Sequence, residues 1–145
     1  MATLAIIGLL LLVSLGGFQK YQRRSNIGSV THEVIGYLDR ARVLSTVSYN
    51  TYRYGIHFEQ GSYTLFRAPT YQQGAAGNEV RTLTSFRFAN PNVFDNGQGG
   101  TTQNVIFSGL AGTTQNTGTI RLESTADSTF FKLLTINGLG TVTIQ

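Results

Sequence analysis

The chain has 145 residues, a formal net charge of +4 and no cysteine. This length leaves room for one modest globular domain beside a helix, and the lack of cysteine excludes disulfides and thiol nucleophiles. Charged residues make up 12% of the chain, about half the usual share. The positive charge therefore reflects a shortage of acids rather than a surplus of bases.

The first 18 residues form an apolar run without a charged side chain. As a helix this run would be about 27 Å long, just short of the roughly 30 Å hydrocarbon core of a bilayer. A membrane helix, a cleaved signal peptide and a buried core helix are the possible interpretations. No basic residue precedes the run, as it would in a signal peptide, and few soluble helices are apolar on every side. We expect a transmembrane or filament-core helix that uses Leu4, Ile6, Ile7, Leu9, Leu10, Leu11, Leu12, Val13, Leu15 and Phe18.

Three glycines, Gly8, Gly16 and Gly17, interrupt this apolar run. Each costs about 0.5–1 kcal/mol relative to alanine inside a helix. They favour either close packing between helices or a point where the helix bends or unwinds.

The next segment, residues 27–48, has apolar residues at helical spacing and charged residues between them. This pattern predicts an amphipathic helix. Its packing stripe, which Ile35 widens, consists of Ile27, Val30, Val34, Tyr37, Leu38, Ala41 and Leu44. Because no turn signal separates the two segments, we expect one helical spine over residues 1–48 and an antiparallel β domain over residues 49–145, an α+β fold.

The second part of the chain alternates apolar and polar residues, which predicts short strands. A first hairpin is expected from residues 52–58 and 62–67, one strand from residues 79–88, and short strands at 104–107 and 119–123. The segment Gly100–Asn104 recurs as Gly112–Asn116, which suggests two similar turns that lead into adjacent strands. Near the end, Asn137-Gly138 lies between two apolar runs, the strongest short-range hairpin signal.

Catalytic and metal-binding patterns do not emerge from the sequence. His32 and His57 have no cysteine or acid at ligand spacing. The stretch Asp95–Gly99 offers oxygen ligands but lacks the acid density and the closing glutamate of a calcium loop. We therefore expect no enzyme, no cofactor and no metal.

A basic cluster of Lys20, Arg23 and Arg24 adjoins the apolar run. It suggests contact with lipid headgroups or, alternatively, electrostatic binding to nucleic acid. The C-terminal strands contain only Arg121 and Lys132 as basic residues, so nucleic-acid binding is weakly supported.

Several motifs resemble type IV pilins and type II secretion pseudopilins. Leu4–Leu10 is similar to the middle of the pilin helix motif, and Phe18–Tyr21 to the aromatic pair that ends it. The expected first and last hairpins resemble those of the H-type (FimT-like) branch, through Tyr54–Phe58, Ser62–Arg67, Phe131–Asn137 and Gly140–Ile144. The resemblance implies a pilin fold and identifies the glycines of the apolar run as the segment that loses helical structure.

This resemblance also implies a function. The chain would be a structural subunit of a helical pilus or pseudopilus filament, assembled through its N-terminal hydrophobic helix with its own copies or with other pilins. It would lie in the inner membrane until the pilus or secretion machinery moves it into an extracellular or periplasmic filament. The family has a basic leader, a cleavage site and a glutamate near the mature N-terminus, whereas the first acid here is Glu33. Either N-terminal residues are missing or the subunit assembles without that glutamate.

A monomeric, membrane-anchored β domain that binds a ligand or a surface is the alternative hypothesis. It needs the same apolar anchor but no self-assembly, so the sequence leaves both functions open.

Overall fold

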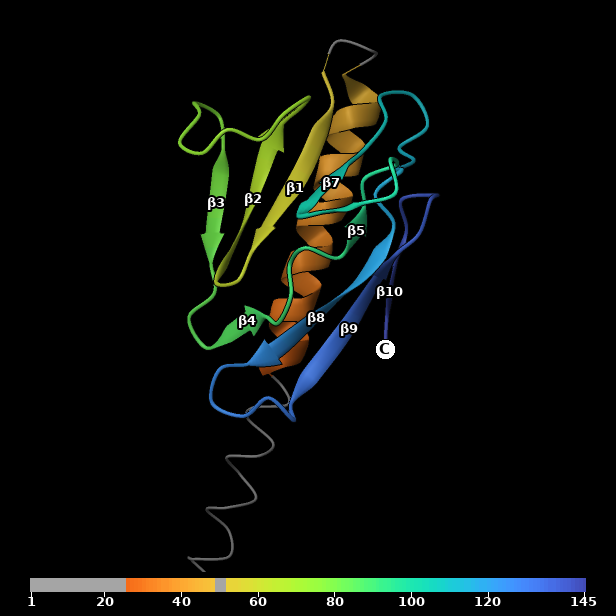
Figure 1. Cartoon of the computed structure of the whole chain (residues 1–145). Helices are drawn as coiled ribbons and strands as arrows, with labels where there is room; N and C mark the ends of the chain where they lie inside the picture. Colours follow the sequence, from red (N-terminus) through yellow and green to blue (C-terminus); the bar gives the residue numbers. More distant parts are fainter. Residues whose placement is uncertain (1–25, 49–51) are drawn as a thin grey trace, which may run out of the picture.

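The computed structural model describes residues 26–48 and 52–145. In the described part, a helix over residues 26–47 is followed by strands that are joined by turns and loops (Figure 1). The strands are β1 (Tyr54–Glu59), β2 (Ser62–Arg67), β3 (Glu79–Thr82), β4 (Phe86–Phe88), β5 (Phe94–Asp95), β6 (Thr101–Thr102), β7 (Asn104–Ile106), β8 (Gly118–Ser124), β9 (Phe131–Ile136) and β10 (Val142–Ile144).

Most of these strands belong to two four-stranded antiparallel sheets. The β1 sheet has the order β3-β2-β1-β7, and the β8 sheet has the order β10-β9-β8-β4. Strands β5 and β6 form a separate two-stranded sheet. Figure 1 shows the helix lying against both larger sheets, and side chains from the helix and both sheets share one hydrophobic core.

The helix is held by the apolar stripe on its inner side. Ile27, Val34, Leu38 and Ala41 are all buried, because residues three or four apart lie on one side of a helix. The remaining stripe residues are half-buried and pack against the same core; they are Val30, Ile35, Tyr37 and Leu44.

Two polar residues that the apolar pattern did not include also lie on this buried side. Thr31 Oγ1 donates a hydrogen bond to the Ile27 carbonyl at 2.6 Å. Ser45 Oγ accepts the backbone N–H of Tyr54 at 2.8 Å. The second bond ties the end of the helix to the start of β1. Both buried hydroxyls thus have hydrogen-bond partners, as buried polar groups generally do.

The prediction of a pilin fold, one long helical spine followed by an antiparallel β-sheet domain, is wrong. The helix of the described residues is 22 residues long, over residues 26–47, and the strands after it divide into separate sheets. No helix in the described ranges is long and apolar enough to cross a membrane. The physical reason is its amphipathic composition, since charged side chains such as Asp39 and Arg40 occupy its outward side.

Several sequence predictions fall on residues 1–25, which lie outside the described residues. They concern the apolar run, its glycines at positions 8, 16 and 17, and the basic cluster at positions 20, 23 and 24.

The first predicted hairpin is confirmed, since β1 and β2 pair from Tyr54↔Arg67 to Glu59↔Ser62. Both faces of this hairpin are buried, however, whereas an alternating pattern predicts only one. The ring of Tyr71 covers the second face, where it stacks on His57 at 3.7 Å and meets Phe66 edge-on at 5.5 Å.

The single strand predicted for residues 79–88 is wrong. Its first part, β3, pairs with β2, whereas its second part, β4, pairs with β8 in the other sheet. The turn between β1 and β2 links these two parts: the Gly61 carbonyl accepts the Leu83 N–H, and the Gln60 carbonyl accepts the Phe88 N–H, both at 2.8 Å. Residues 83–85 therefore carry the chain from one sheet to the other.

The last predicted hairpin is confirmed by the pairing of β9 with β10, but its turn is longer than Asn137-Gly138. Asn137 Oδ1 accepts the backbone N–H groups of Leu139 and Thr141, both at 3.1 Å. The left-handed position belongs to Gly140, with φ +75°, a conformation that favours glycine.

The repeated segments share one local geometry. Thr102 Oγ1 accepts the Asn104 N–H, and Thr114 Oγ1 accepts the Asn116 N–H. The prediction that the strands after these turns are adjacent is wrong, because β7 and β8 lie in different sheets.

Candidate functional site

Both histidines take part in structural interactions. His32 Nδ1 lies 2.8 Å from the Gly28 carbonyl of the same helix. His57 is 8% exposed, and its Nδ1 lies 2.7 Å from Asn104 Oδ1. Among the described residues, no group of three or more His, Cys, Asp or Glu side chains could hold a metal ion.

The oxygen-rich loop after β5 uses its side chains to stabilise its own turn. Asp95 Oδ1 accepts the Gly97 N–H at 2.8 Å. Asn96 Oδ1 accepts the N–H groups of Gln98 and Gly100 at 2.8 and 3.0 Å. These bonds explain the residue types without a bound calcium ion.

A first polar network joins the helix to β2 and β3. Arg40 donates two hydrogen bonds of 2.7 Å to the Glu79 carboxylate, and Arg81 Nε donates to the Tyr37 hydroxyl at 2.5 Å. The bond to Tyr37 raises the pKa of Arg81. These contacts fix the helix against the edge of the β1 sheet.

Beside this network, the Tyr63 hydroxyl donates to Glu33 Oε1 at 3.0 Å. Burial of the ring, followed by this hydrogen bond, raises the pKa of Tyr63. A groove of about 320 Å³ opens next to the pair, between the helix and residues 82–86. Its walls combine polar side chains with Val30, Leu83 and Phe86, and Glu33 is the acidic residue among them.

A second polar network lies on the outer face of the β8 sheet. The register pairs Arg87 with Glu123, Glu123 with Phe131 and Arg121 with Leu133. Since side chains directly opposite each other, and those two residues apart, share one face of a sheet, all five project to the same side. Leu122, between the two charged residues of β8, is fully buried on the other side.

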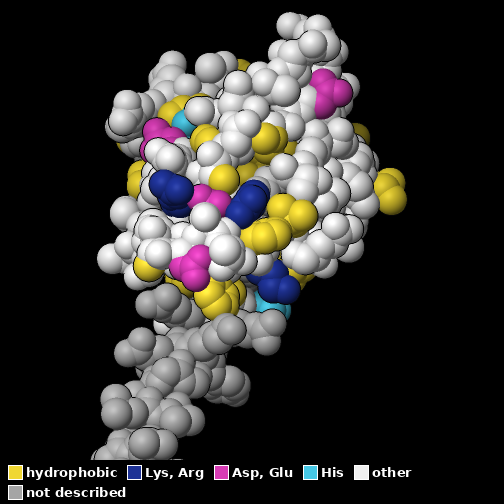
Figure 2. Space-filling model, turned by 60° about the horizontal axis from the view of Figure 1, so that its bottom comes forward, with side chains coloured by type: hydrophobic (Ala, Val, Ile, Leu, Met, Phe, Trp, Pro, Cys, Tyr) yellow, Lys and Arg dark blue, Asp and Glu magenta, His cyan; other side chains and the backbone are white. Residues whose placement is uncertain are grey.

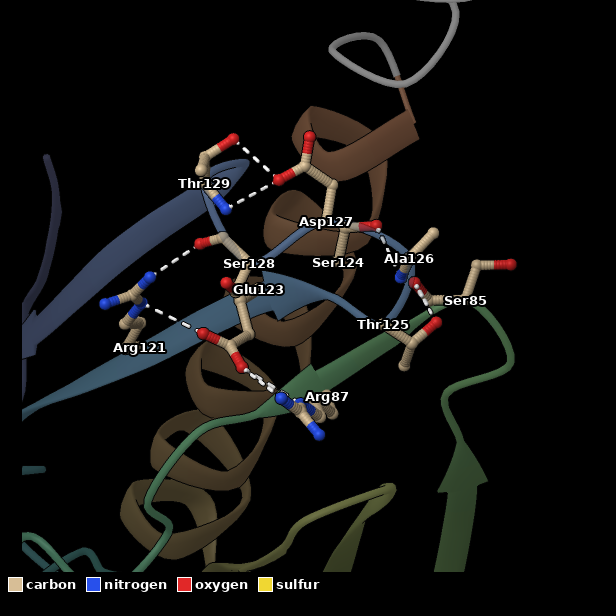
Figure 3. A network of polar contacts seen from close by, with 10 residues as sticks. All are labelled: Ser85, Arg87, Arg121, Glu123, Ser124, Thr125, Ala126, Asp127, Ser128 and Thr129. Atoms are coloured by element: carbon tan, nitrogen blue, oxygen red, sulfur yellow. Dashed lines mark hydrogen bonds and ion pairs between the residues drawn. The ribbon is translucent and has the colours of Figure 1, made fainter.

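At the centre of this network, the Glu123 carboxylate lies between two arginines (Figure 3). Arg87 Nε donates to Glu123 Oε1 at 2.9 Å. Arg121 Nε lies 3.1 Å from Glu123 Oε2 as an ion pair, without the alignment of a hydrogen bond. The Glu123 side chain is only 6% exposed, whereas the arginine side chains are 43% and 40% exposed.

Arg121 is held in place by two further contacts. Its Nη2 donates to the Ser128 carbonyl at 2.6 Å, and its guanidinium lies 4.1 Å from the centre of the Phe131 ring. Cation–π contacts of this kind orient an arginine while leaving other N–H donors available. Arg121 is therefore fixed on a surface where it still meets solvent.

We define the arginine face as the five residues that project from the outer side of the β8 sheet: Arg87, Arg121, Glu123, Phe131 and Leu133. Two guanidinium groups face one carboxylate, so the charges of the face sum to +1. Figure 2 shows this side of the molecule, where basic side chains flank an acidic one beside hydrophobic side chains. Exposed arginine and aromatic side chains are the types enriched in protein interfaces, and the Phe131 side chain is 43% exposed.

A second exposed surface lies on the outward side of the helix. We define the outer helix stripe as Gly36, Asp39, Val43 and Val47, which recur at intervals of three or four residues. Val43 and Val47 are 57% and 75% exposed, and a Cβ added to Gly36 would meet no atom within 4 Å. This stripe faces away from the sheets that the buried stripe contacts.

The arginine face was not predicted from the sequence. Arg87 and Glu123 are 36 residues apart, and their meeting depends on the move of β4 into the β8 sheet. The alternation of charged residues at Arg121 and Glu123 was the only local signal. Comparison of the chain with protein-family models, curated proteins and solved structures found no match.

Proposed function

We propose that this chain is a structural subunit of a helical filament of the type IV pilus or pseudopilus kind, and not an enzyme. The observation that carries the proposal is the division of the helix into two sides. The inner stripe packs into the protein's own core, whereas Val43 and Val47 stay exposed. Exposed apolar side chains that lie next to each other on one side of a helix support a contact with another protein surface, whereas isolated ones are common on any protein.

Only a short basic segment separates the apolar run of residues 1–18 from this helix in the sequence. In the proposed function, this run keeps the subunit in the membrane before assembly and is transferred to a filament afterward. The transfer needs no catalytic residue, because one apolar environment replaces another. The partners are copies of the chain or co-assembling pilins, and the filament is extracellular or periplasmic.

Electron microscopy of the native protein and of Leu11→Asp tests this function. Leu11 lies in the middle of the apolar run, and a charged side chain at the centre of a bilayer costs at least about 2.5–3.5 kcal/mol. We expect thin regular filaments from the native chain and none from the variant. The far-ultraviolet circular dichroism of the two should show the same β signal, which indicates that the β domain of the variant is still folded. Normal filaments from Leu11→Asp would contradict the proposed role of this run.

A membrane-anchored monomer that binds a ligand is the second candidate. The groove beside Glu33 and Tyr63, of about 320 Å³, is the observation that favours it. This candidate predicts only dispersed monomers in detergent, and saturable binding of a small cation such as a primary amine that is lost in Glu33→Gln.

A further inference from the structure

We propose that the outer helix stripe of one copy docks on the arginine face of the next copy. The inference rests on the proposed filament function, and it names the two surfaces through which the folded parts of neighbouring subunits would meet. Each surface combines a charge with adjacent apolar side chains, and the two charges are opposite in sign.

The charges of the two surfaces are complementary. Asp39 is exposed, and within the described ranges it has no hydrogen bond or ion pair. The nearby cations on its helix are engaged elsewhere: Arg40 with Glu79, and Arg42 through its Nε with the Gly112 carbonyl. In the arginine face, two guanidinium groups share the one carboxylate of Glu123 and are 43% and 40% exposed, so they offer the partner that Asp39 lacks.

The apolar side chains of the two surfaces have similar spacing. Val43 and Val47 are one helical turn apart, a rise of about 6 Å. Phe131 and Leu133 are two residues apart on β9, a separation of about 6.6 Å. The two valines can therefore lie over the two sheet residues while Asp39 approaches the guanidinium groups.

The shape of the helix surface also permits this contact. Gly36 precedes Asp39 by one turn and leaves the backbone uncovered, so a flat sheet can approach closely. The two surfaces are on opposite sides of one copy, since the helix lies against the inner side of the β8 sheet. A contact between different surfaces of identical copies does not close on itself as a two-fold dimer does and can build an open helical array.

Disulfide cross-linking tests the contact directly, because the chain has no cysteine of its own. The full-length variants Val43→Cys and Phe131→Cys are mixed and oxidised mildly. We expect a covalent heterodimer from the mixture and ladders of multimers from the double variant. The matched control pairs Val43→Cys with Val80→Cys on β3, which is 59% exposed and lies outside the arginine face; it should cross-link at least tenfold less.

Further variants keep the test decisive. If Phe131→Cys fails to fold, the pair Gly36→Cys and Ser128→Cys is used in place of Val43→Cys and Phe131→Cys. Ser128 is suitable because it is exposed and borders Arg121. Adding Asp39→Lys should reduce the cross-linked yield severalfold by introducing repulsion. Equal yields from the Val80→Cys control, or efficient cross-linking of Val43→Cys with itself, would overturn the inference, the second by showing contact between helices.

Microscopy of the same native protein separates the two proposals. Filaments without the expected cross-link would overturn this interface and leave the filament function standing. The cross-link without filaments would support the interface and count against the filament function.

Discussion

The side chain of Asn116 covers the outer edge of β7 by accepting the backbone N–H of Ile106 at 2.9 Å. Its amide nitrogen also donates to the Asp95 carbonyl at 2.8 Å. An uncovered strand edge can pair with other chains, so one amide both protects β7 and connects it to β5. The same local turn at Asn104, the equivalent position of the repeat, does not have this role.

Asn116→Ala removes both bonds and leaves a half-buried backbone donor without its partner. We expect the free energy of unfolding to fall by about 1–3 kcal/mol, measured by urea denaturation. Gln115→Ala is the control, because this exposed neighbour should change stability by less than about 0.5 kcal/mol. Equal losses in the two variants would contradict the edge role of Asn116.

Glu123→Gln should destabilise the protein more than Glu79→Gln, although the Arg40–Glu79 ion pair has the shorter distance, 2.7 Å. Glu123 is nearly buried between two arginines, and we expect a loss of about 2–3 kcal/mol when its charge is removed. Glu79 is 43% exposed, so water screens its pair and the loss should stay below about 1 kcal/mol. Thermal and urea unfolding of both variants measure the difference; a larger loss in Glu79→Gln would refute this ranking.

Gly140→Ala and Gly74→Ala separate steric crowding from backbone strain. The two glycines have nearly the same φ, +75° and +74°, but a Cβ on Gly140 would lie 2.2 Å from the Gly112 carbonyl oxygen, whereas Gly74 has open space. Gly74→Ala should cost about 1–2 kcal/mol from the left-handed conformation alone. Gly140→Ala should cost clearly more, because the backbone must also move, and chemical denaturation of the pair measures the excess.

Tyr63 should make stability fall at alkaline pH. Burial and the hydrogen bond to Glu33 raise its pKa in the folded protein, whereas in the unfolded chain the phenol ionises near its ordinary value of about 10. The folded state keeps the proton that the unfolded state releases, so this contribution is complete below about pH 10 and declines above it. Urea unfolding from pH 8 to 11 should show a smaller decline for Tyr63→Phe than for the native protein.

The elements that depend on neighbouring residues could be predicted from the sequence. The three- and four-residue spacing of Ile27, Val34, Leu38 and Ala41 indicated the buried side of the helix, because one helical turn brings such residues together. The hairpin of β1 and β2 was predicted for the same reason, since its strands are separated only by a short polar turn. Local patterns did not reveal that Tyr71 covers its second face.

Short-range patterns were therefore sufficient to predict the amphipathic helix, the antiparallel hairpins and a surface with few charges. Only the folded chain shows that residues 79–88 divide between two sheets, that Arg87 and Arg121 meet at Glu123, and that Asn116 covers β7. These features depend on pairings between segments far apart in the chain. Periodicity records which side of an element is buried, whereas the partner it is buried against depends on the packing of the whole chain.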